Sequence, residues 1–229
     1  MVWQRWNVWF GNRPEMPFTS KPYPHRILLT LGENTNQRIL SWQHDSIIQQ
    51  ATVKLTKLHS TDTLVITAKG NIVRSRGGVT AFYTAQLNDL SSNAQYAYQV
   101  LSGEKQTEWY QFKTTSTNSP FSFMYIGDVQ DRDTSNTSKQ AFQYIYQQFP
   151  EADFWAFGGD QIERPMNSYW EAFMNDLDGI RQSTPIIAIA GNHEYLKYAI
   201  RKIDDRFTYT FPYFINNHNI LHYFACYCF

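Results

Sequence analysis

The sequence has few cysteines, no excess of charge and no long apolar run. Its only two cysteines, Cys226 and Cys228, lie in the last four of 229 positions. This count excludes the disulfide framework of a small cystine-rich domain and leaves the redox compartment open. Lys+Arg and Asp+Glu number 20 each, so the chain lacks the basic excess typical of nucleic-acid binding, and we expect no nucleic-acid partner.

No apolar run approaches the roughly 20 residues that a membrane-spanning helix needs. We therefore expect no membrane span. The amino end, residues 1–11, lacks the uninterrupted apolar core of a signal peptide. Hydrophobic residues make up 42% and charged residues 17% of the chain, which predicts a folded globular protein rather than a disordered one.

Residues 25–115 have the signals of an all-β module. Short runs rich in β-branched and aromatic residues are bounded by turn residues, among them 32–34 and 69–71. The expected strands are 27–31, 38–42, 51–55, 64–68, 80–87, 96–101 and 109–113. This number of short strands without a cysteine pair predicts a fibronectin-type sandwich, with Trp42 in its core and Tyr96 or Tyr98 at a tyrosine corner.

Two connecting segments flank this module. Residues 1–24 contain four prolines between positions 14 and 24, which predicts an extended lead-in rather than a helix. Residues 116–120 are polar and end in Pro120, as expected of a linker.

The remaining segment, 121–229, alternates strand and helix signals. Apolar runs at 121–126, 154–157 and 185–190 are separated by helical patterns at 137–149 and 168–178. The runs show little alternation, which predicts parallel strands covered on both faces. Right-handed crossovers would place the carboxyl ends of all three strands on one edge, where open α/β sheets bind ligands. After Glu194 the pattern is less regular, and 195–206 is compatible with a helix or a loop.

Each of these three strands is followed by glycine and then by a polar residue. The three endings are Gly127-Asp128, Gly158-Gly159-Asp160 and Gly191-Asn192-His193-Glu194. Glycine lets the backbone turn sharply or approach a bound ion, and Asp and Asn supply hard oxygen ligands. One Gly-Asp pair alone is more often a turn or a helix cap. Three pairs in register at strand ends favour a metal site.

These motifs, in this order, resemble the calcineurin-like metallophosphoesterases. The preceding β module makes the resemblance closest to the purple acid phosphatase branch. The resemblance implies an αββα catalytic domain and two metal ions, held here by Asp128, Asp160 as the bridging ligand, and Asn192. It implies that His193 contacts the phosphoryl oxygen or the leaving group, that a metal-bound hydroxide attacks a phosphate ester, and that the protein is secreted or periplasmic.

Three features depart from the family pattern. Gln130 stands where many members have a histidine ligand, and Glu163 replaces the tyrosine that binds iron in purple acid phosphatases. The identity of the metal therefore stays open between Mn, Zn, Fe, Mg and Ca, and iron bound by a tyrosinate is not implied. The family supplies further histidines from a later part of the chain, and His218 and His222 do not match them. We therefore expect an incomplete site, and the apolar end 225–229 favours a truncated, frameshifted or fragmentary chain.

Two hypotheses of function follow. The first is a metal-dependent phosphoric ester hydrolase of the acid phosphatase type. The alternative is a catalytically inactive binding protein that uses the aromatic-rich β sandwich to contact glycans or a partner. A nuclease is disfavoured by the balanced charge. The substrate, the metal and the oligomeric state are not specified by the sequence.

Overall fold

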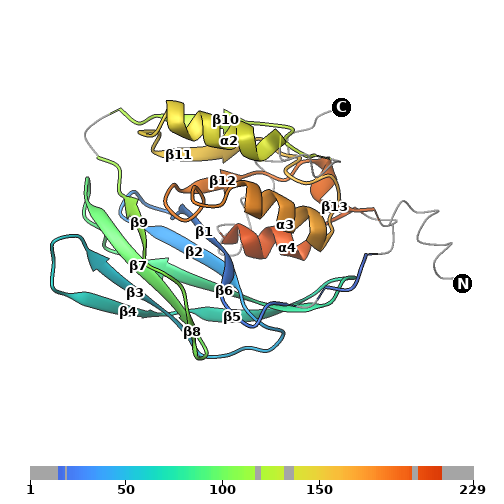
Figure 1. The fold of residues 1–229 in the computed structure, drawn as a ribbon, viewed down its shortest axis with the longest axis horizontal. Coiled ribbons are helices and arrows are strands. Elements are labelled where there is room, and N and C mark those ends of the chain that lie inside the picture. Colours follow the sequence, from blue (N-terminus) through green and yellow to red (C-terminus); the bar gives the residue numbers. More distant parts are fainter. Residues whose placement is uncertain (1–14, 19, 117–119, 132–136, 198–200, 213–229) are drawn as a thin grey trace, which may run out of the picture.

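The structure, a computed structural model, describes residues 15–18, 20–116, 120–131, 137–197 and 201–212. A β sandwich forms one side of the molecule, and a three-stranded sheet with helices forms the other (Figure 1). This arrangement confirms the expected order of a fibronectin-like sandwich followed by an α/β domain. The segments 1–14 and 213–229, the latter with both cysteines and with His218 and His222, lie outside the described residues.

The sandwich consists of two antiparallel sheets. Its first sheet has the order β1-β2-β6-β5, and its second has the order β4-β3-β7, with both β8 and β9 pairing with β7. The strands are β1 (His25–Leu31), β2 (Arg38–Gln43), β3 (Ala51–Lys57), β4 (Thr63–Thr67), β5 (Lys69–Arg74), β6 (Val79–Leu87), β7 (Gln95–Ser102), β8 (Lys105–Gln106) and β9 (Tyr110–Lys113).

Two aromatic predictions for the sandwich are confirmed. Trp42 is 1% exposed and stacks on Tyr83 with ring centroids 5.6 Å apart. Tyr96 is the corner tyrosine, because its hydroxyl accepts a hydrogen bond from the Ser91 amide at 2.7 Å while its ring stacks on Phe112. The turn expected at 69–71 is wrong. Those residues begin β5, and the chain crosses from one sheet to the other at Ala68.

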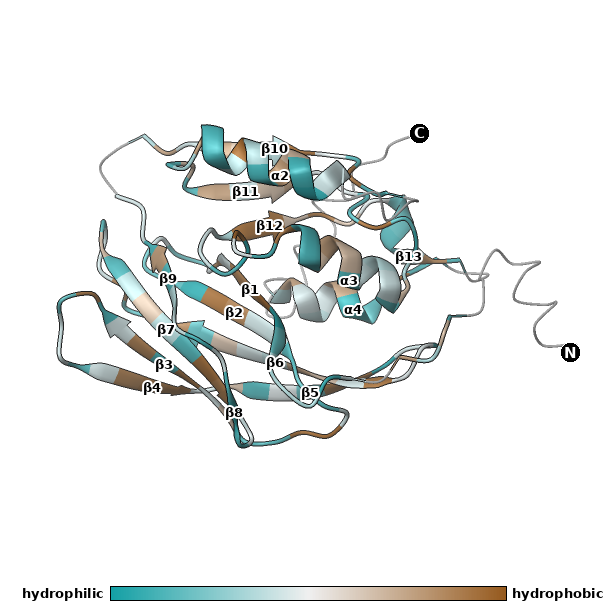
Figure 2. Cartoon of the chain, viewed as in Figure 1, coloured by the Kyte–Doolittle hydropathy of each residue, from teal (hydrophilic) through white to brown (hydrophobic). Residues whose placement is uncertain are grey.

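The sheet of the α/β part is parallel, as expected, with the order β10-β11-β12. Its strands are β10 (Phe123–Ile126), β11 (Phe154–Phe157) and β12 (Ile186–Ala188), joined by α2 (Thr137–Gln148) and α3 (Asn167–Asp176). Strand β12 is hydrophobic along its whole length (Figure 2). The four apolar positions predicted for the second helix are all buried, namely Trp170, Phe173, Met174 and Leu177.

The predicted coverage of this sheet on both faces is wrong for β10. Trp155 and Phe157 of β11 pack under Phe142 of α2 with ring centroids 6.0 and 5.7 Å apart. On the other face, Phe123 is 49% and Tyr125 67% exposed. Nothing in the described part of the chain covers that face of β10, so the apolar run that suggests a central strand forms an aromatic outer surface.

The region after Glu194 contains a small hairpin and a helix. Strands β13 (Tyr195–Leu196) and β14 (Lys202–Ile203) pair antiparallel, and α4 (Asp205–Thr210) follows. Helix α4 lies over the first sheet of the sandwich, against β2 and β6. This contact explains why every residue of β2 is buried: one face of the strand lines the sandwich core and the other meets α4.

The sandwich and the α/β part are joined by hydrogen bonds. The Leu29 amide of β1 donates to the Arg181 carbonyl at 2.8 Å, and the Arg181 guanidinium, which is 6% exposed, donates to the Ile27 carbonyl. The Tyr98 hydroxyl donates to the Gln182 carbonyl at 2.8 Å. Leu28 belongs to the hydrophobic core of the α/β part rather than to that of the sandwich. The two parts therefore share a rigid seam.

The lead-in segment also enters this seam. The Glu15 carboxylate accepts hydrogen bonds from the Arg206 guanidinium at 2.6 Å and from the Asn167 amide at 2.6 Å. Asn167 begins α3, so Glu15 satisfies a free amide at the positive end of that helix. Asp204 binds the same guanidinium at 2.7 Å. The lead-in is thus anchored to the α/β part at Glu15.

A buried histidine in the seam predicts acid sensitivity. Burial, with the neighbouring Arg26, lowers the pKa of His25 from 6.5 to about 3. The unfolded chain takes up this proton near pH 6.5 and the folded protein does not, so stability is lost as pH falls below 6.5. In His25→Asn, we expect the loss of unfolding free energy between pH 7 and pH 5 to shrink by about 2 kcal/mol. Urea unfolding at both pH values measures it.

The control for this test is His59→Asn. His59 is exposed and has a positive φ of 68°, a conformation that asparagine tolerates. This variant should keep the pH dependence of the parent protein. Equal pH dependence in the His25 variant and the parent would show that His25 does not titrate as its burial requires.

Candidate metal centre

Three loops carry the predicted ligands to one edge of the parallel sheet. Asp128 follows β10, Asp160 follows β11, and Asn192 begins the short 3-10 helix η1 (Asn192–Glu194) that follows β12. Because β10, β11 and β12 run parallel, all three residues lie at the carboxyl edge, as predicted. Asp128 and Asn192 are exposed and Asp160 is 8% exposed.

Both aspartates have an unusual backbone conformation. The φ angle is +53° at Asp128 and +51° at Asp160, in the left-handed region that non-glycine residues avoid. Such a conformation costs about 1–3 kcal/mol per residue and tends to occur at functional sites. The two strand ends therefore turn in the same strained way, which directs the chain back across the edge of the sheet.

The three loops contact one another directly. The Asp128 amide donates to the Gly159 carbonyl at 3.3 Å, and the Gln130 amide donates to the Asp160 carbonyl at 3.0 Å. The Asp160 carboxylate accepts a hydrogen bond from the His193 amide at 2.9 Å. Asp160 thus links the first loop to the third.

Two of the four glycines, Gly159 and Gly191, are required by close approach to the backbone or to a candidate ligand, and Gly127 is not. Gly159 has a φ of +109°, and a Cβ there would lie 3.0 Å from the Gly191 Cα. A Cβ on Gly191 would lie 2.1 Å from a carboxylate oxygen of Asp160. At Gly127 the φ is not positive, and a Cβ would meet no described atom within 4 Å. The expectation that glycine is needed for a sharp turn or a close approach therefore holds for the second and third loops only.

Glu194 fixes the second and third loops to each other. Its carboxylate accepts hydrogen bonds from the backbone amides of Gly191 at 2.7 Å, Asp160 at 3.0 Å, Gln161 at 2.8 Å and Ile162 at 3.1 Å. The side chain is 0% exposed. Burial raises the pKa of Glu194 to about 7, and the amides of Gly191 and Ile162 oppose this shift by favouring the ionised form.

His193 is held by the main chain of the second loop. Its Nδ1 lies 2.7 Å from the Glu163 carbonyl oxygen and 3.7 Å from the Glu163 carboxylate. A carbonyl only accepts, so Nδ1 carries the proton in this contact. In the neutral ring, Nε2 is then the nitrogen without a proton. Glu163 stands at the place of the family's tyrosine, is 7% exposed, and lies beside the His193 ring.

The donor set suits a hard cation in part. Asp128, Asp160 and Asn192 offer oxygen ligands, and the buried Oε1 of Gln130 has no hydrogen-bond partner among the described residues, which marks a further oxygen without a protein donor. The described residues contain no group of three or more His, Cys, Asp or Glu side chains placed to hold a metal ion. The residues present therefore fit part of a centre for oxygen-preferring cations.

The role of Glu194 is not evident from the sequence, because a carboxylate next to candidate ligands looks like another ligand. The usable signal is its place three residues after Gly191 at the start of a short helix. A glutamate side chain at that position can reach back to the preceding amides.

Comparison with known proteins agrees with this geometry. The family model of the purple acid phosphatase N-terminal domain matches residues 24–114, and that of the calcineurin-like phosphoesterases matches residues 121–227. The α/β part of the chain belongs to the calcineurin-like phosphoesterase family. Within it, the sandwich in front places the chain in the purple-acid-phosphatase-like branch. No curated protein matches the chain.

Two solved structures show the same fold for this family member. One is the purple acid phosphatase PPD1 from yellow lupin (Lupinus luteus) seeds, with a TM-score of 0.63, 17% identity, and coverage of 76% of this chain and 36% of that one. The other is PhoD, with a TM-score of 0.55, 13% identity, and coverage of 78% and 40%. The chain thus spans less than half the length of either. The described residues include no helix long and apolar enough to cross a membrane.

The Glu194 clamp yields a testable prediction. Glu194→Gln keeps the size of the side chain but replaces one acceptor oxygen with a donor that faces backbone donors. Loss of charge-assisted hydrogen bonds and the unpaired amides should lower the unfolding free energy by about 2–4 kcal/mol at pH 8. Urea unfolding followed by tryptophan fluorescence measures this.

Glu104→Gln is the matched control, because Glu104 is exposed on the sandwich, and its unfolding free energy should stay within about 0.5 kcal/mol of the parent. Equal stability of the two variants would mean that the four amides find water or other partners and that Glu194 does not join the loops.

Proposed function

We propose that this protein is a metal-dependent phosphoric ester hydrolase. The observation that carries the proposal is the contact of Asp160 with the first and third loops, through the Gln130 and His193 amides. It supports a common centre in which Asp128 and Asn192 each hold one cation and Asp160 is shared. A pair of cations would lower the pKa of a bound water and neutralise charge on the phosphoryl oxygens.

The protein's own residues would orient the ester. The Glu163 carbonyl accepts the Nδ1 proton of His193 at 2.7 Å. Nε2 would therefore donate a hydrogen bond to a phosphoryl oxygen, or a proton to the leaving group, in the imidazolium form of the ring, in which both nitrogens carry protons. Glu194 keeps the loops of Asp160 and Asn192 in register before any ligand arrives. This pre-organisation means that binding does not have to order the loops.

The metals would be Mn, Zn, Fe, Mg or Ca, since carboxylate and amide oxygens accept all of these. Phosphate esters other than nucleic acids are the substrate class that we infer, because the chain has no net positive charge. We also infer a division into domains 25–115 and 121–229 joined at 116–120, and a secreted or periplasmic location, which the family supports.

Cation binding and turnover test the proposal separately. Isothermal titration of the full chain with Mn²⁺, Zn²⁺, Fe²⁺, Mg²⁺ and Ca²⁺ should detect binding of at least one cation, and Asp160→Asn should weaken that binding by about tenfold or more, because a shared carboxylate is lost. His193→Gln should leave cation binding unchanged but lower the hydrolysis of p-nitrophenyl phosphate by about 10²-fold.

Asp89→Asn is the control, since Asp89 is an exposed aspartate that also has a positive φ, +56°. This variant should bind cations as the parent does. If the parent binds none of the five metals, or if Asp160→Asn and Asp89→Asn bind them equally, the proposed centre is wrong.

The alternative, a binding protein without catalysis, is favoured by one observation. The described residues lack a group of three His, Cys, Asp or Glu ligands. Cation binding that is lost in Asp160→Asn, without hydrolysis of any phosphate monoester by the parent, would support this alternative.

A further inference from the structure

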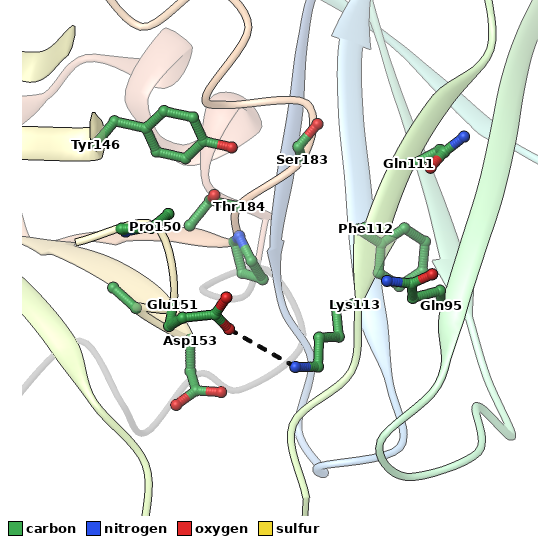
Figure 3. A pocket seen from close by; sticks show the side chains of 12 residues that line it. Gln95, Gln111, Phe112, Lys113, Tyr146, Pro150, Glu151, Asp153, Ser183 and Thr184 are labelled. Atoms are coloured by element: carbon green, nitrogen blue, oxygen red, sulfur yellow. Dashed lines mark ion pairs between the residues drawn. The ribbon is translucent and has the colours of Figure 1, made fainter. Parts of the chain in front are cut away.

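A cleft lies in the seam at the end of the α/β sheet opposite the candidate metal centre (Figure 3). One wall comes from β7 and β9 of the sandwich. The other comes from residues 150–153 and 183–185, which precede β11 and β12 and so lie at the amino ends of the parallel strands. The cleft has a volume of about 220 Å³, less than the roughly 300–1,000 Å³ of sites for drug-sized ligands. It suits a ligand about the size of one small ring.

Neutral hydrogen-bonding side chains line both walls. Figure 3 shows Tyr146, Ser183 and Thr184 on one side and Gln95 and Gln111 on the other. Amides and hydroxyls can each donate and accept. Within the described part of the chain, none of these five side chains makes a hydrogen bond. Their donors and acceptors are therefore available to a ligand, and Thr184 is only 8% exposed.

The charged groups around the cleft have polar partners within the protein. The Lys113 ammonium lies 3.8 Å from the Glu151 carboxylate. The Asp153 carboxylate accepts a hydrogen bond from the Ser122 amide at 2.9 Å. Burial lowers the pKa of the nearby Arg38, and the charge of Asp153 opposes that shift. A charged ligand would have to compete with these contacts, whereas a neutral one would leave them intact.

The walls are fixed before a ligand binds. The Ser183 and Thr184 amides donate to the Ile180 carbonyl at 3.0 and 2.8 Å, and Gln95 is paired with Lys113 in the β7–β9 ladder. A site with a fixed main chain loses less conformational freedom on binding.

We propose that this seam cleft binds a neutral, polyhydroxylated ligand the size of one pyranose ring, as a free sugar or as the end of a glycan. Each hydroxyl of such a ligand both donates and accepts, which matches the amides and hydroxyls of the walls. The apolar ring atoms of Pro150 and the ring of Tyr146 would contact the C–H faces of the sugar. This site is separate from the phosphoesterase centre and does not depend on it.

The test uses the full chain and ligand-detected NMR titration with four probes: methyl α-D-mannopyranoside, methyl α-D-glucopyranoside, methyl β-D-galactopyranoside and N-acetyl-D-glucosamine. We expect saturable binding of at least one, with a dissociation constant of about 1 mM. Thr184→Val and Gln111→Ala should each weaken it about tenfold, as expected for the loss of one hydrogen bond.

Matched controls are Thr67→Val and Gln106→Ala, which change exposed residues of β4 and β8 outside the cleft. Both should bind the sugar as the parent does. If Thr184→Val fails to fold, Gln111→Ala still decides the question, because Gln111 is exposed. A trisaccharide ending in the bound sugar separates the two sources: tighter binding than the free sugar indicates a glycan end, and equal or weaker binding indicates the free sugar.

Three results would overturn the proposal. They are the absence of saturable binding for all four probes, binding that neither cleft variant weakens, and tighter binding of glucose 6-phosphate or N-acetylneuraminic acid than of the neutral sugars. Because no phosphate ester hydrolysis is measured, failure here leaves the proposed phosphoesterase function untouched.

Discussion

The carboxylate of Glu194 is the interaction on which the candidate centre depends. Parallel strands bring loops to one edge of a sheet, but they do not fix how the loops lie across it. Here one buried side chain binds four amides from the loops after β11 and β12. The strained turn at Asp160 and the contact of Asp160 with the His193 amide both occur between these loops, so they rely on the same clamp.

The seam makes the sandwich part of the support for this centre. Strand β1 bonds to residue Arg181, which lies on the connection from α3 to β12. Helix α4 follows the third loop in sequence and packs on β2 and β6, so the sandwich contacts the chain both before β12 and after the third loop. The sandwich is therefore a structural neighbour of the α/β part rather than a module attached by a linker alone.

The sequence predicts what local patterns encode. Short runs bounded by turn residues indicate the sandwich, helical spacing indicates the buried positions of α3, and the Gly-Asp and Gly-Asn endings indicate the edge of the sheet that carries the candidate ligands. Prediction fails where tertiary contacts decide. Lys69 and Gly70 look like a turn but pair with β6, and the apolar β10 is open on one face. Helix α4 has only six residues, too few for a periodic signal, and the seam cleft joins residues that are distant in sequence.

The left-handed backbone conformation at Asp128 and Asp160 lowers the stability of the folded protein, while it places two carboxylates at the edge of the sheet. Glycine would adopt these φ angles without steric strain, so the folded state would be easier to reach with glycine at either position. A protein under selection for thermal endurance alone would tend to lose these two carboxylates, as other functional sites trade activity for robustness. Five other non-glycine residues in the described part of the chain, among them Asp45 and Asp89, share this conformation, so the two carboxylates mark the edge of this sheet only together with the contacts between its loops.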